Sequence, residues 1–571
     1  MSTESSGTFS FLMKENIVAK PGFNRWLVPP ASIAIHLCIG SVYAWSVFNP
    51  QLTKQLGVVA SSADDWSLSS VVWIFSVAIV FLGLAAAFAG KWLEKVGPRY
   101  VGVVAACLWG GGFIVGSVGI STHQLWLVYL GYGALGGCGL GLGYVSPVST
   151  LIRWFPDKRG MATGMAIMGF GGGAMIGAPL KLWLLSIYAK APEFLGAESA
   201  VTLITEGGRR FAETAAGQVE VVIATAAQAA ALPGAAEAGV YVVGTGNTGA
   251  ASTFMTLGIV YFIIMVIASF LYRVPAEGWK PEGWEPAPAD ASKGMISTKH
   301  VHIDQALKTK QFWLLWIVLC FNVTAGIGVI GVAKTMINEI FGSLPMVTLA
   351  FAGTYVLMIS VFNMVGRFFW ASTSDFIGRK NTYHCFFLIG IALYMSIPFF
   401  ASSGGTGALI GFYIATMVIF TMYGGGFATV PAYLADLFGT LHVGGIHGRL
   451  LTAWSTAGVL GPFAITFLRN ISKNNAITDL AANVDPTAFA DKFGAPVAQL
   501  KQLVEAKTVT ISQLMEIAPA GTIDPTPTLY NTTMYCMAAL LVVGFFANLM
   551  IRPVATVHHV DETHPDMVPA E

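Results

Sequence analysis

The sequence predicts an all-α polytopic membrane protein, with 12 transmembrane helices arranged as two six-helix halves. Of its 571 residues, 55% are hydrophobic and only 11% are charged, whereas about 25% charged residues are typical of a soluble domain. The apolar residues fall into twelve runs of about 20 residues or more, the length that crosses a bilayer core of about 30 Å. Short motifs also recur at a spacing of roughly 280 residues, which indicates a duplicated unit.

We expect the twelve spans at residues 26–49, 67–90, 100–120, 124–150, 160–188, 251–272, 311–334, 346–371, 381–401, 406–432, 448–470 and 529–551. In the fourth span, Gly133, Gly137 and Gly141 recur every four residues, a spacing that allows helices to pack closely. The spans divide the chain into an N-terminal tail, a first half, a linker, a second half and a C-terminal tail, at residues 1–25, 26–272, 273–310, 311–551 and 552–571.

Basic residues in the short loops set the orientation. Most of them lie on one side of the membrane: Lys91, Lys95, Arg99, Arg153, Lys158, Arg159, Arg379, Lys380 and Arg449. The loops on the other side carry only Lys54 and Lys334. The positive-inside rule therefore places the linker and both termini in the cytoplasm. Because the N-terminus has no secretory signal, we expect a multi-pass protein of the plasma (inner) membrane.

Charge and composition exclude several functional classes. The 31 basic and 30 acidic residues nearly cancel, so no surface for nucleic acid is indicated. The cysteines lie in apolar runs, at spacings that fit neither a disulfide framework nor a metal site. The sequence also has no phosphate-binding glycine loop and no nucleophile with an adjacent base. We therefore expect no enzyme activity, no metal and no cofactor.

The repeat is read from four pairs of residues. Glu94 and Gly97 follow the second span, while Asp375 and Gly378 follow the eighth, and both pairs are 281 residues apart. Two further pairs are prolines within spans, with separations of 284 and 283 residues: Pro147 with Pro431, and Pro179 with Pro462. Four matches at nearly one spacing favour two copies of a six-helix unit.

Two long polar inserts also occupy equivalent places, at about 189–250 and about 471–528. Both should lie outside the cytoplasm. The first contains GQVEVVIAT and GVYVVGTG, which alternate like short strands, and the second has a helical pattern near FADKFGAPVAQLKQLVEAK. The inserts form either a cap over the outer mouth or tolerated loop insertions.

Two six-helix units in a parallel repeat, with acidic-glycine-basic loops, resemble the major facilitator superfamily of secondary transporters. Within that frame, four segments look like the oxalate:formate antiporter family: SVYAWSVFNPQL, RWFPDKRGMATG, NMVGRFFWASTSDFIGRK and the loop Ala435–Gly439. The resemblance covers nearly the whole chain outside the inserts. It implies a carrier of small carboxylates without fixing which one.

The repeated loops are candidate gates. Their residues are Glu94, Gly97 and Arg99 in the first half and Asp375, Gly378 and Arg379 in the second. An acidic side chain there can meet a helix N-terminus or an arginine, while glycine permits the tight turn. The alternative is that these loops only retain positive charge for orientation, which explains the basic residues but not the paired acid and glycine.

Arg367 is the strongest candidate for a substrate ligand. It precedes Asp375 by eight residues, so it stands about 12 Å into the membrane from the inner loop. A cation at that depth faces a polar cavity or an anion, unless it reaches the headgroups. The resemblance implies that this arginine binds substrate carboxylate, and Asn363, one turn away, can add a hydrogen bond. Lys181 and Lys334, near the outer ends of their spans, are expected to reach the headgroups.

Four aromatic residues match family positions that line the cavity: Tyr43, Tyr144, Tyr423 and Phe427. Aromatic rings exclude water, and a phenol can still hydrogen-bond a carboxylate. For each residue taken alone, a packing or lipid-facing role is the alternative.

Trp454 is a departure from the family pattern. The dicarboxylate carriers of the resembled family have a lysine at this place in the eleventh span, so a dianion here would face Arg367 alone. This favours a small monocarboxylate such as formate, lactate or pyruvate over oxalate. The inference assumes no replacement cation, and His36, on the same face as Tyr43, is a candidate that could also carry a proton. A hydrogen-bonded helix contact is the alternative for His36.

These observations predict a secondary active transporter of small carboxylates that works by alternating access, as an anion exchanger or a proton symporter. The expected partners are a small organic anion, a proton in the symport case, and membrane lipid. Two alternatives remain: a carboxylate sensor that does not transport, and a carrier of neutral solutes, which would not require Arg367.

Overall fold

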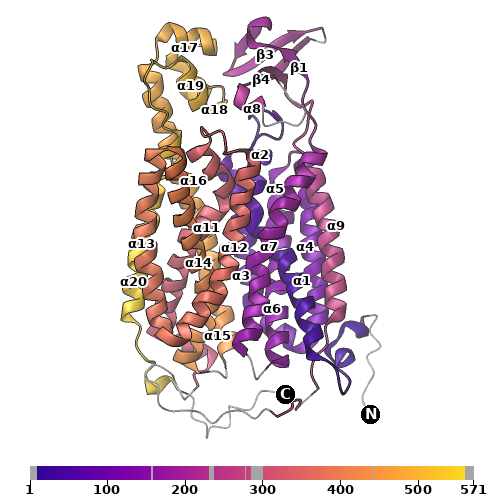
Figure 1. The fold of residues 1–571 in the computed structure, drawn as a ribbon. Helices are drawn as coiled ribbons and strands as arrows, with labels where there is room; N and C mark the ends of the chain where they lie inside the picture. The colour runs from indigo at the N-terminus through magenta and orange to yellow at the C-terminus, as the bar shows by residue number, and fades with distance from the viewer. Residues whose placement is uncertain are drawn as a thin grey trace.

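The computed structural model describes residues 9–155, 159–215, 217–229, 237–276, 278–283, 300–439 and 442–559. Within them, twelve helices are long and apolar enough to cross a membrane, which confirms the predicted number of spans. Figure 1 shows these helices standing side by side, with strands and short helices gathered above one end. The N-terminal segment, drawn in indigo, and α15 lie at the opposite end.

The first six spans are built from seven α-helices and two segments of tighter or wider winding. Their bounds are α1 (Val28–Gly40) with the 3₁₀ segment η4 (Ser41–Val47), α3 (Leu68–Val96), α4 (Pro98–Ser121), α5 (Leu125–Val128) with the π-helical η5 (Tyr129–Leu135) and α6 (Gly136–Trp154), α7 (Arg159–Tyr188) and α9 (Ala250–Leu271). Short helices η1 (Ser10–Leu12), η2 (Lys14–Ile17) and η3 (Arg25–Leu27) precede them, and α2 (Asn49–Leu52) follows η4.

The second six spans include helices that extend beyond the predicted ends. Their bounds are α11 (Lys310–Phe341), α12 (Leu349–Ile377), α13 (Arg379–Ser403), α14 (Gly405–Phe438), α16 (Thr452–Asn483) and α20 (Asn531–Met550), with α10 (Ile303–Ala306) before them, α15 (Val443–Leu450) leading into α16 and η10 (Thr556–His558) after them. α16 runs 13 residues past the predicted end at 470. No glycine or proline interrupts ISKNNAITDLAAN, so the helix continues out of the membrane until Pro486.

The glycines of the fourth span set a close helix contact. A Cβ at Gly137 would lie 2.6 Å from the Ala78 carbonyl oxygen, and one at Gly141 would lie 2.4 Å from that of Leu82. Side chains at these positions would force α6 away from α3. The predicted packing role of this glycine stripe is therefore confirmed.

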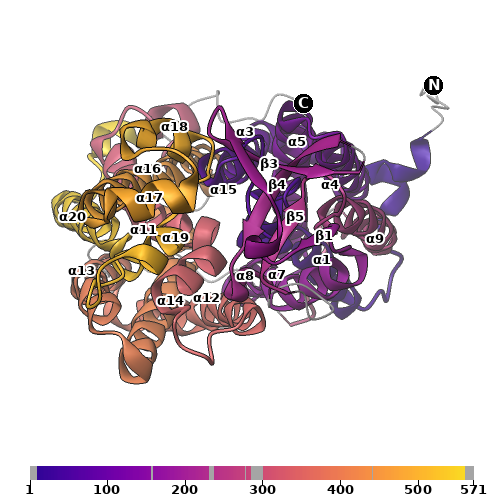
Figure 2. The same ribbon diagram turned by 90° about the horizontal axis from the view of Figure 1, so that it is seen from above.

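The two halves meet along two pairs of helices, α3 with α16 and α7 with α12. On the first seam, Ser455 Oγ donates a hydrogen bond to the Val80 carbonyl oxygen, 3.2 Å away. On the second, Ser360 Oγ donates to the Gly171 carbonyl oxygen at 2.6 Å and accepts from the Met175 amide at 3.1 Å. Hydroxyl groups thus join the halves without burying a fixed charge in these seams. Figure 2 shows the two groups of helices from above.

The first insert forms a small sheet. Its strands are β1 (Phe194–Gly196), β2 (Leu203–Glu206), β3 (Arg209–Thr214), β4 (Gly217–Ala224) and β5 (Gly239–Val242), all paired antiparallel in the order β1-β5-β4-β3-β2. The short helices η7 (Glu198–Ala200) and α8 (Ala226–Ala229) accompany the sheet. Strands β4 and β5 confirm the strand prediction for GQVEVVIAT and GVYVVGTG.

The second insert is helical and packs against the first. Its elements are α17 (Pro486–Phe493), η8 (Val497–Gln499), α18 (Leu500–Glu505), α19 (Ile511–Ile517) and η9 (Thr526–Thr528). Lys492 forms an ion pair with Glu198 at 3.0 Å. Thr508 Oγ1 donates a hydrogen bond to the Gly208 carbonyl oxygen. We call the two inserts together the cap, because they meet above one end of the helix bundle (Figures 1 and 2).

Candidate functional site

Arg367 lies inside the bundle and not at its lipid face. Its side chain comes from α12 and is 3% exposed. The side chain presses against α7, where a Cβ on Gly171 would lie 2.8 Å from Arg367 Nε. The Nε group donates a hydrogen bond to Asn363 Oδ1, 3.1 Å away. The predicted pair on one face of the eighth span is therefore formed, and the headgroup alternative does not fit this buried side chain.

Six aromatic rings surround the guanidinium, and we call them the aromatic cage. Its members come from four spans besides that of Arg367: Tyr43, Tyr144, Phe170, Tyr423, Phe427 and Trp454, each no more than 3% exposed. Arg367 Cζ lies 5.5 Å from the centre of the Phe427 ring, within the range of a cation–π contact. The cage thus closes the site on both sides in this arrangement.

The cage is held together by ring contacts between the two halves. Tyr423 donates a hydrogen bond from its hydroxyl to that of Tyr43, 3.1 Å away. The Phe427 and Trp454 ring centres are 4.6 Å apart, and Trp454 lies 5.7 Å from Tyr144. The Tyr43 and Tyr144 phenols also lie within electrostatic range of Arg367. Residues from both halves therefore share one site.

Three buried donors in the site have no hydrogen-bond acceptor among the described residues. They are Arg367 Nη1, Asn363 Nδ2 and Trp454 Nε1. A buried donor left unsatisfied costs about 1–3 kcal/mol, and more when it is charged. A ligand that supplies oxygen acceptors and one negative charge would satisfy all three.

Phe170 and Gly171 belong to the site, although the sequence analysis did not select them. Phe170 contacts Tyr43, Tyr144 and Trp454 with ring centres 5.2 to 5.6 Å apart. Gly171 gives Arg367 room against α7. The run GFGGGA in the fifth span was the available signal, since glycine in a helix often marks a close approach.

His36 lies at the edge of the cage. Its ring centre is 5.5 Å from that of Tyr144, and its Nε2 atom is 3.1 Å from the Tyr144 carbonyl oxygen. Because a carbonyl oxygen only accepts, the imidazole donates in this contact. The contact matches the helix-contact alternative, and a role in proton coupling stays a prediction.

Lys181 and Lys334 do not reach the headgroups, which corrects the expectation for both. Each side chain is fully buried. Lys181 Nζ donates to the Ser41 carbonyl oxygen at 2.7 Å and also contacts that of Ala44 at 3.4 Å. The first span changes there from α1 to the 3₁₀ segment η4, with a break at Ala44, and this frees carbonyl groups for the ammonium.

Lys334 has no hydrogen-bond partner for Nζ within the described part of the chain. It follows Gly331 by one turn of α11, and the Gly331 carbonyl oxygen accepts from Asn49 Nδ2 at 2.8 Å. Lys334 therefore lies on the seam between the halves. It is eight residues, about 12 Å of helix, outward from Gly326, which packs on the Tyr423 ring.

The two candidate gate loops differ in their contacts. In the second half, Asp375 and Asp436 both approach Arg379, which also donates to Ser374, and Gly378 has φ +85°. In the first half, Gly97 has φ +89°. Arg99 donates to the carbonyl oxygens of Phe11, Phe270 and Tyr272 at 3.0 to 3.3 Å. The Glu94 side chain lies outside the described residues. The loops sit away from the aromatic cage, and their gating role stays a prediction.

Comparison with known proteins identifies the family. The Major Facilitator Superfamily profile matches residues 31–197 and 210–462. The chain belongs to the major facilitator superfamily. It is similar to the oxalate:formate antiporter of Oxalobacter formigenes, with 24% identity over 84% of this chain and 95% of that protein. It is also similar to apicoplast pyruvate carrier 1 of Toxoplasma gondii, with 22% identity over 73% and 78% of the two chains.

Shorter and structural similarities agree with this assignment. Monocarboxylate transporter 13 of Rattus norvegicus is 33% identical over 22% of this chain and 29% of its own length. Among solved structures, a bacterial homologue of the human lysosomal transporter Spinster, inward-facing and unoccupied, covers 93% of this chain and 98% of its own, with TM-score 0.56 and 14% identity. The major facilitator fold predicted from the sequence is therefore confirmed. These relatives are transport proteins and not enzymes.

Proposed function

We propose that this superfamily member is a secondary active transporter of small carboxylates, located in the plasma (inner) membrane with both termini in the cytoplasm. The observation that carries the proposal is the set of unsatisfied donors around Arg367. Relatives named for oxalate, formate, pyruvate and monocarboxylates support the same substrate class.

Alternating access follows from the energetics of this site. The aromatic cage is built from both halves, so it opens to one side only when the halves rock apart. Closing the cage around an unpaired guanidinium is costly, whereas a bound carboxylate compensates the charge and makes closure cheaper. Exchange results when the empty carrier closes too rarely to return.

The cage favours a monoanion. Arg367 is the one cation among its side chains, since Trp454 stands where a second cation would lie. Lys181 and Lys334 are both farther outward: Lys181 is ten residues, about 15 Å of helix, beyond Gly171. A dianion in the cage would keep one negative charge in a poorly solvated site, so we propose formate, lactate or pyruvate before oxalate.

The test is uptake of labelled formate, lactate, pyruvate and oxalate into proteoliposomes, with and without internal substrate. We expect uptake to need internal substrate, or an inward proton gradient in the symport case. Arg367→Gln should abolish it, while Arg552→Gln, at an exposed arginine outside the bundle, should not. Uptake of carboxylates by a folded Arg367→Gln protein at the original rate would refute the proposal. Binding without any transport would favour the sensor alternative.

A further inference from the structure

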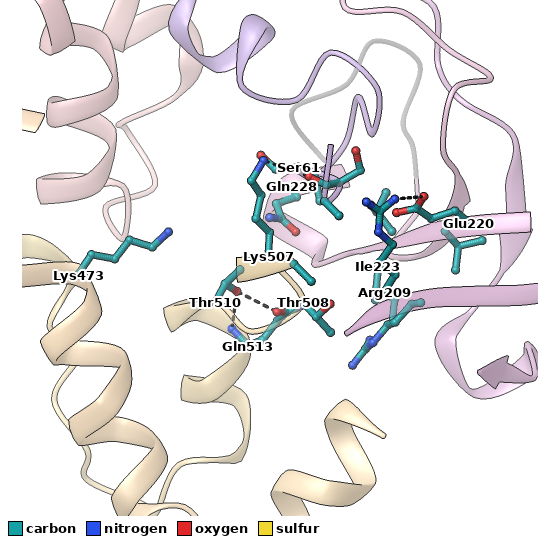
Figure 3. A pocket seen from close by; sticks show the side chains of 17 residues that line it. Ser61, Arg209, Glu220, Ile223, Gln228, Lys473, Lys507, Thr508, Thr510 and Gln513 are labelled. Atoms are coloured by element: carbon teal, nitrogen blue, oxygen red, sulfur yellow. Dashed lines mark hydrogen bonds and ion pairs between the residues drawn. The ribbon is translucent and has the colours of Figure 1, made fainter. Parts of the chain in front are cut away.

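A second polar pocket lies in the cap, outside the membrane-spanning bundle, and we call it the cap pocket. Its empty volume is about 770 Å³, part of it open to solvent. The first half lines it with the loop 60–63, strands β3 and β4, and α8. The second half lines it with α16, residues 506–508 and the beginning of α19. Figure 3 shows side chains from both groups of elements turned toward this space.

The charges that line the cap pocket are mostly positive. They are Arg209, Arg210, Lys473 and Lys507 against one acid, Glu220. Arg209 is compensated, because Asp64 binds it at 2.6 Å and Glu220 at 3.3 Å. The remaining three cations leave the pocket with an excess of positive charge, which attracts anions.

Neither lysine of the cap pocket has a carboxylate within ion-pair distance among the described residues. Lys507 Nζ donates to the backbone carbonyl oxygens of Ser62, at 3.1 Å, and Asp65. Lys473 has no hydrogen bond or ion pair within the described part of the chain, and Figure 3 shows its side chain extending from α16 toward the pocket. A cation held in this way retains its capacity to bind an anion.

Arg210 supplies a donor from the opposite half. The residue is 7% exposed, and its Nη1 atom has no hydrogen-bond partner. Glu198 approaches that atom only to 3.6 Å. The other terminal nitrogen donates to the Lys492 carbonyl oxygen, which fixes the guanidinium at the pocket wall. The pocket therefore contains an immobilised donor that is buried and unsatisfied.

We propose that the cap pocket binds a small carboxylate anion, with Lys473 and Lys507 donating from the second half and Arg210 from the first. The side-chain amides of Gln228 and Gln513 line the same space and add neutral donors. Because the anion touches elements of both halves, its binding favours the arrangement in which the cap is closed. This site is separate from the cage, and its existence does not depend on transport.

The experiment uses the full-length Arg367→Gln protein in nanodiscs, so that binding at the cage is removed. Formate, malonate and inorganic phosphate are titrated by calorimetry. We expect a carboxylate to bind this protein, and Lys473→Gln to weaken binding about tenfold, the loss that follows removal of one charge-assisted hydrogen bond. Lys501→Gln is the matched control, because Lys501 is an exposed lysine of the same insert and does not line the pocket.

A second readout reports on closure. In the Arg367→Gln protein, the bound carboxylate should slow amide hydrogen exchange in β3 and in residues 506–510, and Lys473→Gln should remove this protection. The proposal is overturned if Arg367→Gln binds no carboxylate, if Lys473→Gln and Lys501→Gln bind equally, or if phosphate binds and both carboxylates do not. A melting curve without anion for each variant confirms that it is folded.

Discussion

The aromatic cage and the cap pocket treat positive charge in opposite ways. In the cage, one guanidinium stands among six rings that are almost fully buried. In the cap pocket, four cations share a wall that is partly open to solvent and already neutralised at Arg209. A cation in the membrane gains most from a single ligand charge, whereas cations near water can be spread over several groups. The comparison separates a selective site from a receptive one.

Removing one cation from each region gives the largest difference. Arg367→Gln should lower carboxylate transport about a hundredfold or more, because the ligand loses a buried bidentate partner. Lys473→Gln should leave the maximal transport rate within about twofold, since other cations remain in the cap pocket. Initial uptake rates in proteoliposomes measure both. Equal losses in the two variants would remove the distinction between the regions.

The contact between Gly171 and Arg367 gives the next effect. Gly171→Ala places a Cβ 2.8 Å from Arg367 Nε, so the guanidinium must shift, and we expect transport to fall about tenfold. Gly164→Ala is the control in the same helix, because nothing lies within 4 Å of that Cβ. Unchanged transport by a folded Gly171→Ala protein would contradict the placement of the guanidinium.

A second cation in the cage should change selectivity and not simply activity. In Trp454→Lys, an ammonium replaces the ring that lies 4.6 Å from Phe427, so the cage can compensate a dianion. We expect the ratio of oxalate to formate uptake to rise about tenfold. Trp454→Phe, which adds no charge, should leave this ratio unchanged. A ratio that stays fixed in Trp454→Lys would argue against charge as the basis of selection.

The two regions should also respond differently to pH. Burial lowers the pKa of the Lys507 ammonium, although Asp65 and Asp64 raise it in part. As the pH rises toward this lowered pKa, Lys507 loses its proton and carboxylate binding in the cap pocket should weaken, by about threefold between about pH 7 and pH 10. The guanidinium of Arg367 keeps its charge over this range.

Calorimetry separates the two responses. The Arg367→Gln protein reports the cap pocket alone, and the Lys473→Gln protein reports the cage. A cap pocket whose affinity does not change with pH would contradict the role given to Lys507.

The smallest effect is expected at the edge of the cage. His36→Gln keeps an N–H group that can donate to the Tyr144 carbonyl oxygen, so exchange at equal pH on both sides should stay within about twofold. If His36 carries the coupled proton, the same variant loses uptake driven by a proton gradient. Loss of exchange itself would show that the imidazole does more than hold α1 against α6.

Much of the central site could be predicted, because depth along a span is read directly from the sequence. Arg367 and Asn363 are one turn apart, and the cost of a charge in lipid points to a ligand. The direction in which a side chain points is not read in this way. Lys181 and Lys334 were expected at the headgroups, yet the break in the first span and the seam between the halves bury them.

The contacts of the cap were beyond sequence reasoning for a related reason. Strands β4 and β5 were predicted from alternation, but the bonds between the inserts join residues about 300 positions apart, such as Thr508 with Gly208. Local periodicity carries no information on such pairs. Likewise, Phe170 entered the cage because α7 faces the other half, which the pattern of the fifth span does not show.

Equilibrium binding of isotopically labelled formate tests the central claim most directly. The protein is the Lys473→Gln variant in nanodiscs, so that the cap pocket contributes little. We predict saturable binding of one formate, and loss of this binding when Arg367→Gln is added. Formate that binds the double variant with the original affinity would contradict the claim that Arg367 holds the carboxylate.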